Sequence, residues 1–124
     1  MAVFSKYIEG ILQQISDSNA VLQNLNDKPG DLDVIKKELA KITGLLQVLA
    51  NKLEANPEEA SEYHYFLSPS KFYLNNYDFF REIETVSLLY SDDPMRLKGI
   101  RLAILDALDE KNLIGHISAF LRGL

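Results

Sequence analysis

The chain contains no cysteine. This absence excludes disulfide bonds, thiolate nucleophiles and zinc sites built on thiolates. Four prolines and six glycines, most of them isolated, are too few for an all-β chain built from many tight turns. No apolar run approaches the roughly 20 residues that a membrane-spanning helix needs. The first ten residues also lack the basic region and long apolar run of a secretory signal. We therefore expect a cytoplasmic protein without a membrane partner.

Basic charge is scarce as well. Aspartate and glutamate number 18 against 13 lysines and arginines, which gives a formal net charge of −5. Nucleic-acid binders usually carry a basic excess, because neutralising backbone phosphates supplies much of their affinity. We therefore expect no nucleic-acid partner.

One local basic group stands out, formed by Arg96, Lys98 and Arg101. It has two interpretations, namely a contact for phosphate or an acidic partner, or the solvated face of a helix balanced by nearby aspartates. No aromatic residue is interleaved with it for base stacking, which favours the solvated face.

Motifs for catalysis or cofactor binding are also missing. The glycines form no phosphate-binding loop. Di-iron bundles need a Glu-x-x-His sequence on each of two helices, and neither histidine has a glutamate three residues before it. His116, with Ser118 nearby, has no acidic residue in the sequence to orient it. We expect no catalytic residue, no cofactor and no metal.

His64 follows the best group of carboxylates in the chain, which is Glu58, Glu59 and Glu62. As a functional site this cluster would bind a metal or transfer a proton. The structural interpretation, a solvated acidic turn followed by a partly buried histidine, is far more common in proteins.

Two amphipathic segments fill residues 1–55. Apolar residues recur there at alternating spacings of three and four, as in a heptad seam. The first stripe, for a helix over about residues 2–25, is Phe4, Ile8, Ile11, Ile15, Ser18, Leu22 and Leu25, broken only by the serine. The second stripe is Leu32, Ile35, Leu39, Ile42, Leu46, Leu49 and Leu53. A short turn ending at Gly30 separates them, with Asp31 as the expected N-cap. This pattern predicts an antiparallel helical hairpin.

The second stripe is wider than a two-helix seam requires, because Val34, Leu45 and Val48 extend it. Either the C-terminal half covers these residues or another molecule does.

Residues 56–124 predict further helices. Asn56 and Pro57 have the signature of a cap and a first-turn proline, which predicts a short helix, although residues 63–67 could instead be extended. A helix is expected from Pro69 to about residue 90, another after Pro94, and a last one with an apolar stripe from Leu113 to the final residue. We predict one all-α domain over residues 1–124, a bundle of about five helices in which the hairpin packs on the C-terminal half.

Nine of the twelve aromatic residues lie between Tyr63 and Tyr90. On the predicted helix, Phe72 and Phe79 fall on the core face. Tyr73, Tyr77 and Phe80 fall on a second face, which is either the other side of a central helix or an interface.

A non-catalytic protein–protein interaction module is the function that these features favour, with another protein, a second copy, or both as partner. The expected interaction surface is Tyr73, Tyr77, Phe80, Leu45, Val48, Arg96, Lys98 and Arg101. One alternative is a bundle that binds an apolar small molecule in a cavity near Phe66, Phe72 and Phe80. The other is an enzyme with an unrecognised site around His64.

Overall fold

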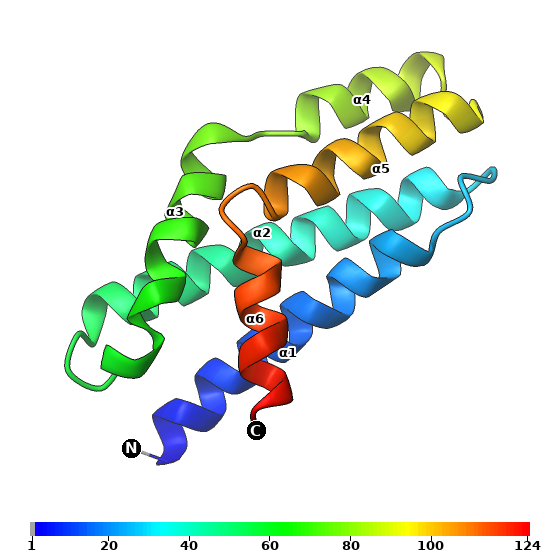
Figure 1. Ribbon diagram of the computed structural model, residues 1–124. Helices are drawn as coiled ribbons and strands as arrows, with labels where there is room; N and C mark the ends of the chain where they lie inside the picture. The colour runs from blue at the N-terminus through cyan, green and yellow to red at the C-terminus, as the bar shows by residue number, and fades with distance from the viewer. Residues whose placement is uncertain (1) are drawn as a thin grey trace.

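The computed structural model describes residues 2–124, and this part of the chain is helical without any strand (Figure 1). It contains six α-helices and one 3-10 helix, where about five helices were predicted. They are α1 (Ala2–Asn24), α2 (Asp31–Ala55), η1 (Ser61–Phe66), α3 (Leu67–Asn76), α4 (Phe80–Leu89), α5 (Pro94–Leu108) and α6 (Leu113–Arg122). No helix within the described residues is both long and apolar enough to cross a bilayer.

The predicted hairpin is confirmed, with α1 and α2 antiparallel and side by side (Figure 1). All seven residues of the α2 stripe are buried. The predicted cap is wrong. Gly30 occupies the N-cap position with a φ of 94°, a conformation that glycine adopts without strain. The Asp31 carboxylate instead accepts a hydrogen bond of 3.1 Å from the backbone N–H of Lys28.

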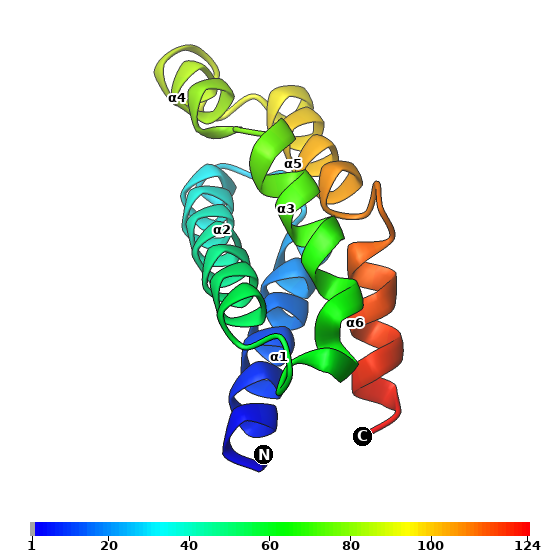
Figure 2. The same cartoon turned by 90° about the vertical axis from the view of Figure 1, so that its left-hand side faces the viewer.

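The helices form two layers. Figure 2 shows the α1–α2 hairpin on one side and α3, α5 and α6 on the other, with α4 at one end. Helix α3 packs on α2, α6 packs on α1, and α5 contacts both helices of the hairpin. One hydrophobic core draws side chains from the hairpin and from the C-terminal helices, so the hairpin packs on the C-terminal half as predicted.

The segment after α2 differs from the prediction. Asn56 does not start a helix. It ends α2, and its side-chain Nδ2 donates a 2.9 Å hydrogen bond to the carbonyl of Lys52. Turns follow, and then the 3-10 helix η1 runs directly into α3. Residues 63–67 are therefore helical, and the extended alternative is wrong.

The single helix expected from Pro69 to residue 90 is broken into α3 and α4. Tyr77 is extended, with φ −131° and ψ 139°. Asn76 closes α3 by donating a 2.8 Å side-chain hydrogen bond to the carbonyl of Phe72. Asp78 lies just before Phe79, the N-cap of α4, and its Oδ1 accepts a 3.1 Å hydrogen bond from the backbone N–H of Phe80. Local side-chain hydrogen bonds of Asn and Asp thus override the helical periodicity here.

Arg101 is buried, so it does not belong to a solvated basic face. Its Nε donates to Asp27 Oδ1 at 2.8 Å and its Nη2 to Asp27 Oδ2 at 3.0 Å, while Nη1 donates to the carbonyl of Leu22 at 3.2 Å. This bidentate pair ties the α1–α2 turn to α5. The hydrogen bond from Arg101 lowers the pKa of Asp27 below its ordinary value.

Candidate functional site

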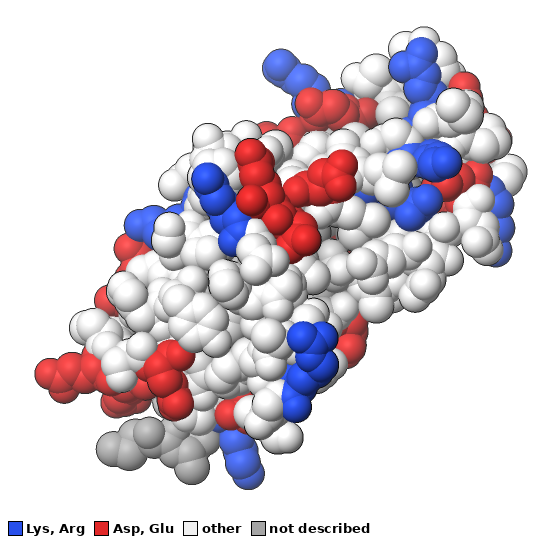
Figure 3. All heavy atoms as spheres, in the orientation of Figure 1, with Lys and Arg blue, Asp and Glu red and all other residues white. Residues whose placement is uncertain are grey.

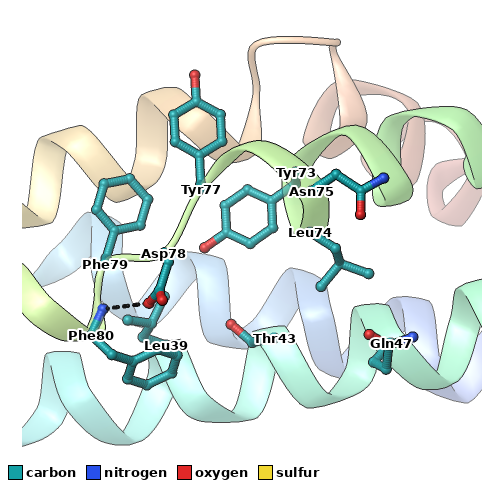
Figure 4. A pocket seen from close by; sticks show the side chains of 10 residues that line it. All are labelled: Leu39, Thr43, Gln47, Tyr73, Leu74, Asn75, Tyr77, Asp78, Phe79 and Phe80. Carbon is teal, nitrogen blue, oxygen red and sulfur yellow. Dashed lines mark hydrogen bonds between the residues drawn. The ribbon is translucent and has the colours of Figure 1, made fainter.

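A cleft of about 320 Å³ lies between α2 and the chain that links α3 to α4 (Figure 4). We call it the linker cleft. Its lining combines aromatic, aliphatic and polar side chains: Leu39, Thr43, Gln47, Tyr73, Leu74, Asn75, Tyr77, Asp78, Phe79 and Phe80. A volume near 300 Å³ is at the small end of the range for ligand pockets.

Two local features of the sequence build this cleft. Leu39, Thr43 and Gln47 recur at spacings of four, so they share one face of α2. Opposite them, the break after Asn76 lets the chain cross from α3 to α4 in an extended conformation. A continuous helix would carry Asp78 on its regular surface, whereas the break turns this side chain toward α2 (Figure 4).

Tyr73 is only 3% exposed, so it is a core residue and not part of an outer face. The predicted core residues Phe72 and Phe79 are only half-buried. The inward stripe is in fact Phe66, at the end of η1, followed by Ser70 and Tyr73 on α3, at spacings of four and three. Hydropathy concealed this stripe because Ser70 is polar; its hydroxyl donates a 2.7 Å hydrogen bond to the carbonyl of Phe66.

The Tyr73 hydroxyl points into the linker cleft (Figure 4). Burial raises the pKa of Tyr73 to about 12. The hydroxyl therefore stays neutral at physiological pH and can both donate and accept a hydrogen bond there.

Tyr77 fixes the linker in place. Its ring stacks between those of Tyr73 and Phe79, with centroid distances of 5.8 and 5.6 Å. Its hydroxyl points away from the cleft and donates a hydrogen bond to Glu110, which follows α5 (Figure 4). This hydrogen bond raises the pKa of Tyr77. The row of three rings thereby connects the linker to the α5–α6 turn.

A second cleft, of about 250 Å³, adjoins the first. It is lined by Lys36, Phe80, Ile83, Glu84, Ser87 and Leu88. Phe80 lines both clefts and is 45% exposed, and Leu88 is 78% exposed. The two clefts share Phe80, and the residues that α2 contributes to them run from Lys36 to Gln47, a stretch of roughly 16 Å at the helical rise per residue. We call the two clefts together the α2–α4 groove.

The eight residues predicted as an interaction surface do not form one surface. Tyr73, Tyr77 and Phe80 come together in the linker cleft. The others lie outside it: Leu45 is half-buried, Val48 and Lys98 are exposed, Arg96 stacks over the Tyr90 ring at 4.2 Å, and Arg101 is buried. Of the residues that widen the α2 stripe, Val48 is 37% exposed, so the C-terminal half does not cover it fully.

Sequence reasoning missed Thr43, Gln47 and Asp78, which supply polar atoms to the cleft. The run Asn75-Asn76-Tyr77-Asp78 was the available signal, because Asn and Asp are typical of turns. Nothing in the sequence could indicate that this turn faces Thr43, which lies 35 residues before Asp78.

The histidines contribute no assembled site within the described residues. His64 is exposed, where a partly buried side chain was expected, and His116 packs its ring edge-on against Tyr65 with centroids 5.7 Å apart. Among the side chains that the structure describes, no group of three or more His, Asp or Glu residues is placed to hold a metal ion.

Charge is unevenly distributed over the surface. Figure 3 shows acidic side chains gathered over the α5–α6 turn and a largely uncharged area across α6 and α1. Comparisons with family models, with curated proteins and with solved structures found no match to this chain. The function is therefore argued from the geometry of the α2–α4 groove.

Proposed function

We propose that this protein is a non-catalytic interaction module that binds a partner protein in the α2–α4 groove. The observation that carries the proposal is Phe80, which lines both clefts and leaves 45% of its surface exposed between them. Large aromatic side chains at the centre of a concave surface are the usual anchors of protein interfaces.

The dimensions of the groove support a helical occupant. Roughly 16 Å corresponds to about three turns of an α-helix. A helix with apolar residues on one face could contact Leu88 in the second cleft, Phe80 and Leu39 where the two clefts meet, and Leu74 in the linker cleft. A second copy of this chain and a different protein are both partners of this kind, and a cytoplasmic location remains part of the proposal.

Native mass spectrometry of the protein gently purified from its source cells tests this function. The wild-type chain should co-purify with a partner, and Phe80→Glu should lose it while keeping the wild-type melting temperature. Leu102→Glu is the matched control. Leu102 is 40% exposed on α5, outside the groove, so this variant should retain the partner. Equal retention by both variants would place the partner elsewhere.

A small-molecule ligand is the second candidate, and the concave, partly polar lining of the linker cleft favours it. Only Phe80, of the three phenylalanines around which a cavity was expected, lines this cleft, since Phe66 is fully buried in the core and Phe72 lies outside the lining. Native mass spectrometry would then detect a monomer with the small added mass of a bound compound, and that compound would raise the melting temperature of the protein. This result would favour the small-molecule ligand over the partner protein.

A further inference from the structure

The linker cleft has a single formal charge. Asp78 is the one acidic residue among the described side chains that line the cleft, and none of them is a lysine or an arginine. Apart from the Tyr77 hydroxyl, which points away, the remaining polar side-chain groups are two hydroxyls and two carboxamides, on Thr43, Tyr73, Gln47 and Asn75. The cleft therefore attracts a cation and disfavours an anion.

The oxygen atoms of the cleft converge. Figure 4 shows the hydroxyls of Tyr73 and Thr43 and the carboxylate of Asp78 directed into the same space, beside the ring of Phe80. A primary ammonium group donates up to three hydrogen bonds, and it is also attracted to the face of an aromatic ring. The cleft offers both kinds of contact.

The hydrogen bonding of Asp78 distinguishes between an ammonium and a guanidinium. One carboxylate oxygen, Oδ1, already accepts the N–H of Phe80 at 3.1 Å. A guanidinium binds best when it bridges both oxygens of a carboxylate. An ammonium is a compact point charge that needs only one oxygen, whereas a guanidinium that bridges both oxygens would share Oδ1 with the Phe80 N–H, so this arrangement favours lysine.

The apolar part of the lining fits the rest of a lysine side chain. Leu39, Leu74 and Phe80 lie beside the polar atoms (Figure 4). The four methylene groups of lysine pack along apolar surface while the ammonium stays with polar partners. We propose that the linker cleft binds the side chain of a lysine from the partner protein, an assignment that rests on the interaction function proposed above.

The test uses small probes on the full chain, followed by amide chemical shifts in NMR. The probe is lysine blocked as its Nα-acetyl methylamide, and the comparator is norleucine blocked in the same way, which has a similar stem without the charge. The lysine probe should shift the amide signals of Asp78, Phe79 and Phe80 and saturate at millimolar concentrations. The norleucine probe should leave them in place.

Asp78→Asn removes the charge and keeps an oxygen that can accept the Phe80 N–H, so the start of α4 is preserved. This variant should weaken binding of the lysine probe about tenfold or more, the usual effect of losing a charge-assisted hydrogen bond. Asp92→Asn is the matched control. Asp92 is exposed in the turn beyond the far end of α4, so its loss should change the affinity less than twofold.

Equal binding of the two probes, or an unchanged affinity in Asp78→Asn, would overturn the lysine assignment. So would 1,4-diaminobutane binding far more tightly than blocked lysine, which would identify a free amine as the ligand. These outcomes are separate from the test of the proposed function. If the probes fail while Phe80→Glu still loses its partner, the groove remains the docking site and only the lysine is excluded.

Discussion

Tyr73 is a residue whose pKa is set by its buried environment and not by its neighbours in the sequence. Burial raises its pKa to about 12, above the value near 10 of an unfolded tyrosine. The neutral form is therefore favoured by folding, and its stabilisation is complete below pH 10 and lost as the pH rises toward 12.

We predict that the free energy of unfolding falls by on the order of 2 kcal/mol between pH 10 and 12 because Tyr73 must ionise. Urea denaturation across this range measures it. Tyr73→Phe should flatten the dependence, whereas Tyr65→Phe, at a tyrosine that is 47% exposed, should leave it unchanged. A profile that is the same in all three proteins would show that Tyr73 titrates normally.

Arg101, unlike Tyr73, is a charged side chain in the interior, and it is paired there with the carboxylate of Asp27. We predict that Arg101→Ala lowers the free energy of unfolding by roughly 3–5 kcal/mol, because Asp27 is left nearly buried without a counter-charge. Chemical denaturation at pH 7 measures the loss. The lowered pKa of Asp27 means that the pair stabilises above about pH 4 and fades below it.

The difference between wild type and Arg101→Ala should therefore shrink as the pH falls below about 4. Arg96→Ala is the control on the same helix, and since Arg96 is exposed it should cost little at any pH. A loss equally small for both arginines would mean that the turn is held to α5 by packing alone.

At the scale of elements, the hairpin is the part on which the other helices pack, and α2 is its central helix. Leu46 lies in the middle of α2 and is fully buried, while Val48 on the same helix is 37% exposed. The two positions differ in burial within one turn, so the same substitution at each separates core from surface.

We predict that Leu46→Asp unfolds the protein or destabilises it by more than 4 kcal/mol, because the carboxylate is buried without a partner. Val48→Asp should remain folded with a melting temperature near that of the wild type. Circular dichroism on heating measures both. A soluble Leu46→Asp variant with unchanged melting would contradict the assignment of this face to the hairpin seam.

At the scale of the whole molecule, the groove joins two stretches that are far apart in the chain. Helix α2 supplies one wall, and the end of α3, the linker around Asp78 and α4 together supply the other. Helix α4 packs mainly on α2 and α5. Much of its surface therefore stays free for a partner. The partner-loss experiment with Phe80→Glu therefore tests whether the groove that these segments form together is the binding site.

Periodicity in the sequence was sufficient for the hairpin and the helical class. These features depend on local hydrogen bonding and on a repeating apolar stripe, both of which are visible along the chain. The same reasoning failed between α3 and α4, where polar Ser70 occupies an inward position and Asn76 and Asp78 break the helix.

What only the tertiary structure decided is which residues of different elements meet. The partnership of Arg101 with Asp27 spans 74 positions, and the convergence of Thr43, Tyr73 and Asp78 joins two layers of the bundle. Helical periodicity specifies the face on which a residue lies, but not the element that packs against that face. Packing and ion pairing between distant segments determined those contacts, and with them the groove from which the function is proposed.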